Sequence, residues 1–179
     1  ILTEQSIGRP DMPFCGFVFV RIGRILRQWN QLEEAYEATK HGLALSRDWN
    51  VADVLALSFI ELADINQALG NDEQAHASIK EAIQIFDSFS PWGSKLAAAH
   101  QAKIDLAHGN IEAAQRWAQT NELTIEGDFE FHREIEYLSL VRVLIAQQRF
   151  DEAYALARHI HEISLESRKR YMELDTLIL

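Results

Sequence analysis

Residues 30–35 read Asn-Gln-Leu-Glu-Glu-Ala, and three later stretches follow the same plan: 70–75 (Gly-Asn-Asp-Glu-Gln-Ala), 109–114 (Gly-Asn-Ile-Glu-Ala-Ala) and 148–153 (Gln-Arg-Phe-Asp-Glu-Ala). The alanines that close these stretches lie 40, 39 and 39 residues apart. A fixed period of a few tens of residues is typical of a solenoid, in which each repeat packs on its neighbours because it cannot bury its apolar face alone. The sequence therefore predicts a chain of stacked repeats.

The segments around these stretches have the periodicity of helices. From Phe14 to Trp29 apolar residues recur at intervals of three and four, which is typical of an amphipathic helix. Asn30 can adopt the left-handed conformation that ends a helix. Ser90 followed by Pro91 is a strong helix start, because serine caps free backbone N–H groups and proline fits the first helical position. Each repeat is therefore predicted to be a pair of helices.

Positions counted back from the closing alanines carry similar residues in the four repeats. Ten residues before are β-branched residues that we expect in the core: Ile25, Ile65, Ile104 and Val143. Twelve residues before are mostly small residues: Gly23, Ala63, Ala102 and Val141. Sixteen residues before are mostly aromatic residues: Phe19, Phe59, Ala98 and Tyr137. Gly16 and Gly23 share a helix face, which predicts a close neighbouring helix. A four-helix bundle with accidental spacing is the alternative.

Composition excludes several classes of protein. The 179 residues are 47% apolar and 25% charged, which is globular composition, and the net charge of −10 disfavours binding to nucleic acid or to an anionic membrane. Cys15 is the only cysteine and is expected to pack, so a reducing, cytoplasmic setting is the simplest interpretation. No apolar stretch approaches the roughly 18 to 20 residues that span a bilayer.

No catalytic or metal-binding motif accompanies the repeats. His159 and His161 lie two apart on a predicted helix and so point to different faces, which is unsuitable for joint metal ligation. Residues 23–27 (Gly-Arg-Ile-Leu-Arg) lack the second glycine and the lysine of a phosphate-binding loop. We therefore predict no catalytic residue, no metal and no cofactor in this chain. The tryptophans are expected to pack: Trp29, Trp49, Trp92 and Trp117.

The repeats resemble the tetratricopeptide repeat (TPR). An aromatic residue, a small residue four later and an alanine twelve beyond match its pattern, as in Phe19, Gly23 and Ala35. The period differs, because that repeat is about 34 residues long and each repeat here has roughly five more, which we place in loops. The proline that ends a TPR is also absent; the residues near its place are Arg47, Asp87, Glu126 and Leu165.

A narrower resemblance covers almost the whole chain. Residues 8–13, 22–35, 102–118 and 133–146 (Arg-Glu-Ile-Glu-Tyr-Leu-Ser-Leu-Val-Arg-Val-Leu-Ile-Ala) look like the helical-repeat domain of MalT-like, LuxR-group ATP-binding regulators. In that family a nucleotide-binding module and a winged helix precede the repeats, and a DNA-binding helix-turn-helix follows them. The resemblance implies a piece of a longer protein, with ATP bound only by an N-terminal domain that is not in this chain.

The fold expected from the repeats and the resemblance is an all-α, right-handed superhelix of about four antiparallel TPR-like helix pairs. An irregular lead-in over 1–13 precedes the repeat domain, 14–179. The repeats are expected at about 14–47, 51–88, 91–123 and 128–165, followed by a terminal helix at 167–179.

The resemblance implies that the first helix of each pair lines the concave groove of the superhelix. Eleven residues before the closing alanines are charged residues: Arg24, Asp64, Lys103 and Arg142. Arg27 and Gln67 lie one turn further along. These six residues are candidates for contacting a ligand or partner. The alternative is a solvated face with salt bridges between neighbouring repeats.

The leading functional hypothesis is a non-enzymatic sensor that controls oligomerisation of a transcriptional activator. Its partners would be a small-molecule inducer or a protein segment in the groove, other domains of the same regulator, and possibly a second copy, without direct nucleic-acid or membrane contact. The alternative is a TPR-type peptide-binding scaffold without small-molecule control. An all-helical enzyme is the least supported hypothesis, because catalytic groups do not cluster in the sequence.

Overall fold

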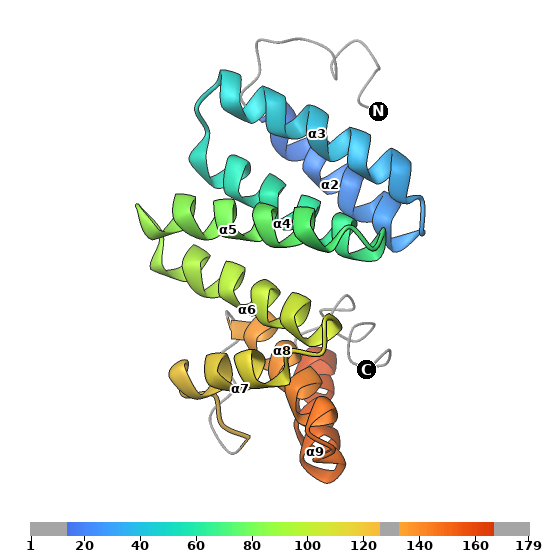
Figure 1. Ribbon diagram of the computed structural model, residues 1–179, viewed down its shortest axis with the longest axis vertical. Coiled ribbons are helices and arrows are strands. Elements are labelled where there is room, and N and C mark those ends of the chain that lie inside the picture. The colour runs from blue at the N-terminus through green and yellow to red at the C-terminus, as the bar shows by residue number, and fades with distance from the viewer. Residues whose placement is uncertain (1–13, 126–132, 167–179) are drawn as a thin grey trace. The chain divides into compact units, whose positions relative to one another are not determined.

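The computed structural model of the chain describes residues 14–125 and 133–166, and these residues form helices and no strand. The helices, labelled in Figure 1, are α2 (Cys15–Gln28), α3 (Leu32–Asp48), α4 (Ala52–Ala68), α5 (Asp72–Asp87), α6 (Pro91–Ala107), α7 (Ile111–Thr120), α8 (Glu134–Ala146) and α9 (Phe150–Glu166). The predicted all-helical class is confirmed. The lead-in over 1–13, the predicted start of the fourth repeat near residue 128 and the terminal helix over 167–179 lie outside the described residues.

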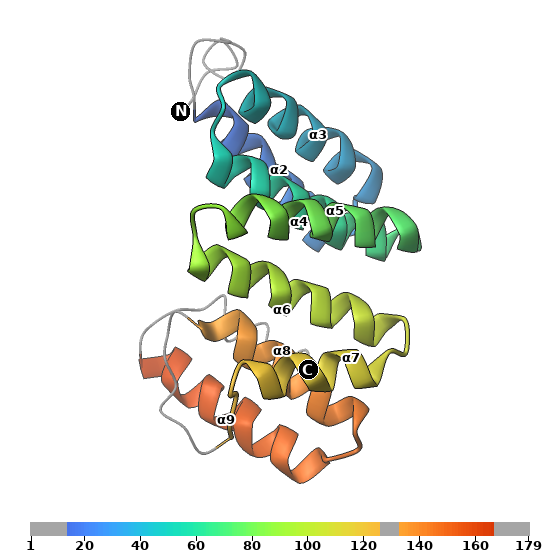
Figure 2. The same cartoon turned by 60° about the vertical axis from the view of Figure 1, so that its left-hand side comes forward.

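The helices belong to two compact units, residues 1–97 and 98–179, and the division falls within α6. In the first compact unit α2 packs on α3 and α4 packs on α5, while α4 also contacts both α2 and α3 (Figure 1). In the second compact unit α8 packs on both α7 and α9 (Figure 2). Each compact unit is thus built from helices that follow one another closely in sequence.

All four repeated stretches form the same turn. Their first residues have left-handed backbone: Asn30 (φ 59°), Gly70 (75°), Gly109 (76°) and Gln148 (61°). The next residue's N–H donates to the carbonyl five residues back: Gln31 to Leu26 (2.9 Å), Asn71 to Asn66 (2.8 Å), Asn110 to Asp105 (2.8 Å) and Arg149 to Leu144 (2.9 Å). This is the Schellman pattern, which ends a helix and satisfies its last carbonyls. The predicted left-handed turn at Asn30 is confirmed.

The closing alanines occupy matching places in successive second helices. Ala35, Ala75, Ala114 and Ala153 are each the fourth residue of their helix, and their exposed fractions are 0, 0, 0 and 4%. Each alanine N–H donates to the carbonyl of the residue four earlier, so all four sit in the same first helical turn. The repeat read from the sequence is therefore a repeat of the structure.

Glycines let α2 and α3 approach closely, as Gly16 and Gly23 predicted. A Cβ added to Gly42 of α3 would lie 2.7 Å from the carbonyl oxygen of Gly16 in α2. A Cβ on Gly23 would collide with the hydroxyl of Thr39, which donates to the carbonyl of Ala35 at 2.8 Å. Because backbone atoms meet here, no larger side chain fits between the helices.

The column expected in the core holds in three repeats and fails in the first. Ile65, Ile104 and Val143 are at most 2% exposed, but Ile25 is 46% exposed, so its predicted core position is wrong. The reason is positional: α2 packs on α4, whereas no described helix precedes α2.

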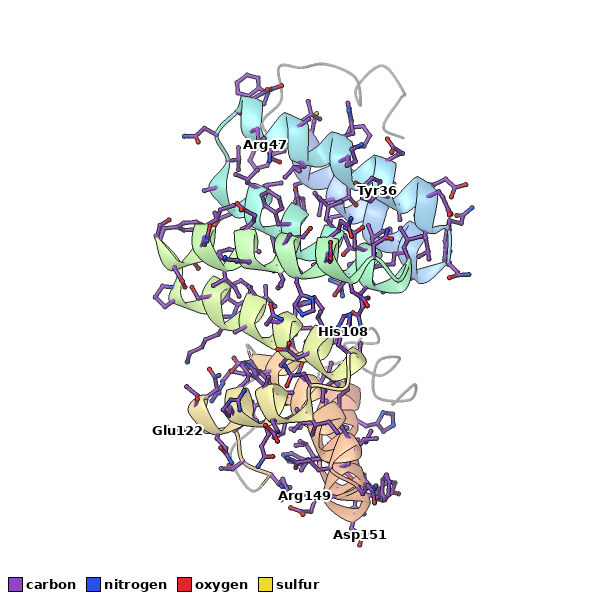
Figure 3. All side chains as sticks on the ribbon, viewed as in Figure 1. Tyr36, Arg47, His108, Glu122, Arg149 and Asp151 are labelled. Atoms are coloured by element: carbon purple, nitrogen blue, oxygen red, sulfur yellow. The ribbon has the colours of Figure 1, made fainter. Side chains whose placement is uncertain are left out.

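Local helix signals in the sequence also reappear in the structure. The Ser90 hydroxyl accepts the Gly93 N–H at 3.1 Å, which confirms the predicted start of α6, and Cys15 is buried as expected. Between α3 and α4, the Arg47 guanidinium, labelled in Figure 3, lies 5.8 Å from the ring centre of Phe59.

Replacing Ala75 with leucine should destabilise the protein. Ala75 is fully buried where α5 begins, so three added carbon atoms overpack the contact, and we expect a loss of about 1 to 3 kcal/mol. Ala77 lies on the exposed side of the same helix, and Ala77→Leu should change stability by less than about 0.5 kcal/mol. Urea denaturation followed by circular dichroism measures both variants. Equal effects would contradict the placement of Ala75 at the helix contact.

The fourth repeated stretch carries an ion pair with a measurable titration. Arg149, labelled in Figure 3, donates from Nε to Glu152 Oε1 (2.7 Å) and from its terminal nitrogen to Oε2 (2.5 Å). These hydrogen bonds lower the pKa of Glu152, because they favour the ionised carboxylate. The pair therefore stabilises the fold above the ordinary glutamate pKa, and this contribution is lost as pH falls through the lowered pKa of Glu152.

Arg149→Gln should raise the pKa of Glu152 towards its ordinary value. A carboxyl-carbon NMR titration of the folded protein measures it, with Lys80→Gln on α5 as a control for general loss of positive charge. An identical Glu152 titration in wild type and Arg149→Gln would refute the pair.

Candidate interaction site

The six residues predicted to line a groove all lie on the first helices of pairs. Arg24 and Arg27 lie in α2, Asp64 and Gln67 in α4, Lys103 in α6, and Arg142 in α8. Asp64 is buried and the other five are half-buried. The structure thus places every candidate on the predicted type of helix.

Arg27 joins two buried carboxylates of the next first helix. Its Nε donates to Glu61 Oε1 at 2.5 Å, and a terminal nitrogen lies 3.3 Å from Asp64 Oδ2. The Glu61 and Asp64 side chains are 7% and 3% exposed, against 21% for Arg27. Carboxylates this deeply buried require a cation or several donors, because desolvation disfavours their charged form. The Arg27 guanidinium therefore fixes the contact between α2 and α4.

The two interpretations that the sequence left open apply to different residues. For Arg27 and Asp64 the structure provides the salt bridge between neighbouring repeats. Arg24, at the equivalent position to Asp64, makes no ion pair within the described parts of the chain. In the second compact unit Arg142 donates to the carbonyl of Leu138 on its own helix at 3.2 Å. A ligand-binding role for the six residues is taken up below as a proposal.

Sequence reasoning missed a second buried ion pair, at the start of α8. Arg133 donates from Nε (3.2 Å) and a terminal nitrogen (2.9 Å) to Glu136 Oε2, and that nitrogen also donates to the carbonyl of Asn121 (2.9 Å). The guanidinium lies 5.7 Å from the ring centre of Tyr137, and the Glu136 side chain is only 5% exposed. The signal was present, since two acidic residues stand here in an otherwise apolar helix.

The tryptophans depart from the expectation that all four pack. Trp29, Trp49 and Trp92 are exposed, because each lies at or beyond a helix end, where few side chains surround it. Trp117 is the exception: it packs against apolar residues of both α6 and α8. Its indole nitrogen is buried and has no hydrogen-bond partner. Exposed tryptophans at helix ends offer apolar surface for a partner.

Groups suited to metal binding do not gather in the described residues. No group of three or more His, Cys, Asp or Glu residues among them could hold a metal ion. His76 and His108 have ring nitrogens 3.0 and 2.7 Å from backbone carbonyl oxygens of their own helices. The described helices also include none that is both long and apolar enough to cross a membrane.

Helix pairs with one repeated turn and a small residue at each pair contact define a TPR-like helical-repeat protein. The sequence profile of the family described as the MalT-like TPR region matches residues 2–179, which is nearly the whole chain, and the chain therefore belongs to this family. No curated protein and no solved structure matches it significantly.

Replacing Arg27 with glutamine should destabilise the protein, because it removes the charged donor from buried Glu61. Loss of one partner of a buried pair costs several kcal/mol, and the partial exposure of Arg27 reduces this to about 2 kcal/mol. The control is Arg158→Gln in α9, whose pair with Glu162 spans 3.6 Å with both side chains more than half exposed. We expect the control to lose less than about 0.5 kcal/mol in urea denaturation. Similar losses in the two variants would refute a stabilising role for the Arg27 cluster.

Proposed function

We propose that this chain is the ligand-sensing and protein-interaction domain of a MalT-like ATP-dependent transcriptional activator. The observation that carries the proposal is the match to the MalT-like TPR region over residues 2–179. In the proposed role the domain performs no chemistry of its own. It receives an inducer or a protein segment and biases the oligomerisation of the complete regulator, whose other modules bind ATP and DNA.

The proposed contact surface is the charged column on the first helices. Arg24, Lys103 and Arg142 are half-buried, so each offers a charge near apolar surface, as binding sites for small polar molecules do. Arg27 and Asp64 already form an ion pair, and Gln67 stands one turn beyond Asp64. A ligand there would interact with charges that also hold neighbouring helices together.

Linkage sets the condition for sensing. A ligand shifts the assembly of the regulator only if it binds the active arrangement more tightly than the resting one, and the coupling is reciprocal. Contact with residues at a helix–helix interface provides such a difference, because those residues change neighbours when the helices shift.

A thermal-shift screen of the purified chain with sugars and small metabolites tests the proposal. A ligand of the native state raises the free energy of unfolding by about 2.7 kcal/mol at one hundred times its Kd, which is a clear rise in Tm. The double variant Lys103→Ala, Arg142→Ala should lose the response. Lys80→Ala with Arg158→Ala, two cations on second helices, should keep it.

The outcomes separate the sensor from the alternative scaffold. A hit whose effect is unchanged in the Lys103 and Arg142 variant would refute the charged column as the binding site. If no small molecule shifts Tm while extended peptides bind, the chain is a TPR-type peptide-binding scaffold without small-molecule control. Sedimentation of the complete regulator with and without the hit then measures the effect on oligomerisation.

A further inference from the structure

The outer side of α2 is an exposed apolar surface. Five of the ten large apolar side chains that are exposed in the described residues lie here: Phe14, Phe17, Val18, Ile25 and Trp29. Their spacing places them on one side of the helix, together with Arg21, whose guanidinium lies 5.4 Å from the ring centre of Phe17. We call these six residues the α2 face. Such a concentration of exposed apolar side chains marks an interaction surface.

The equivalent face of α4 is buried. Val54, Ser58, Glu61 and Ile65 stand forty residues after Phe14, Val18, Arg21 and Ile25, and all four are at most 7% exposed. The helix that packs on α4 from the preceding pair is α2, and the bond from Arg27 to Glu61 lies in that contact. In the second repeat this face therefore receives the first helix of the pair before it.

The same arrangement recurs in the second compact unit. Ser139 of α8, equivalent to Arg21, donates to the carbonyl of Ala99 in α6 at 3.2 Å. Val143, equivalent to Ile25, is buried in an apolar cluster with Ala102, against which Leu106 packs. A first helix thus packs on this face of the next first helix in two independent places, and only the α2 face is bare among the corresponding faces of α2, α4 and α8.

Charge specifies what fits the α2 face. In the contact between α2 and α4, Arg27 lies eight residues before its closing alanine and pairs with Glu61 and Asp64, fourteen and eleven before theirs. In α2 those two positions hold Arg21 and Arg24, and α2 has no acidic residue. A helix stacked on α2 in the same register therefore needs a carboxylate where α2 has Arg27. Two copies of the face packed together would bring Arg21 side chains together, which disfavours a symmetric dimer.

We propose that the α2 face binds the first helix of a further helix pair of the same repeat type, and that this helix has Asp or Glu at the position equivalent to Arg27. The inference concerns stacking of repeats and is independent of ligand sensing. The partner's apolar stripe covers Val18 and Ile25, and its carboxylate pairs with Arg21 and Arg24.

An extended chain tests this proposal. A copy of residues 14–53 is fused directly before residue 14 in place of residues 1–13, which keeps the period of 40 residues between the first closing alanines. In one version the copy carries Arg27→Glu, and in the other it keeps arginine; the chain that simply lacks residues 1–13 is the reference. We expect the glutamate version to melt about 3 to 6 °C above the arginine version. Arg21→Glu in the original α2 should reverse the order, because it swaps the charge that the copy meets.

Several results would overturn the proposal. These are equal Tm values for the two versions, no reversal by Arg21→Glu, or an extended chain without the added helical circular dichroism of one more pair. A dimer of the original chain that Ile25→Glu abolishes would make a second copy the occupant. A fall in Tm on removing residues 1–13 alone would make that segment the cover. The expected result is a monomer whose Tm does not depend on residues 1–13.

Discussion

The close approach of the two helices within a pair is the constraint on which this structure depends. A three-residue turn with one left-handed residue leaves the second helix no choice but to run back along the first, and a small residue must then stand where they meet. Ala35, Ala75 and Ala114 fill that place with no exposed surface. Since the second helix covers one side of each first helix, another side of the first helix is available to its neighbours.

Polar groups enter these helix contacts only with their partners. The α2–α4 contact contains Arg27 with Glu61 and Asp64, and the start of α8 contains Arg133 with Glu136. Burying charge adds little net stability, because the desolvation cost offsets much of the attraction. Its effect is on register: sliding α4 by one turn would leave Glu61 buried without a cation. The charged residues therefore select one stacking of otherwise similar apolar helices.

Features encoded locally were predictable from the sequence, and features that depend on neighbours were not. The turn at Asn30, the helix start at Ser90 and the closing alanines follow from backbone preferences and residue size, which act within a few residues. The exposure of Ile25 and the pairing of Arg27 with Glu61 depend on which helix lies alongside. A repeat alignment describes the average repeat, so it assigned Ile25 a core position that its place at the start of the described helices does not provide. The charged column was found, but its partners were not.

The charges on the first helices connect the proposed function to the fold. A ligand that competes for Arg27 or Asp64 would have to replace a contact that sets how α4 lies on α2. Binding and helix packing would then share the same atoms, so neither could change without altering the free energy of the other. A ligand held only by exposed residues of second helices, such as Lys80 or Arg158, would have no such connection. Under the proposed function, this difference is why sensing belongs to the first helices rather than to the more exposed second ones.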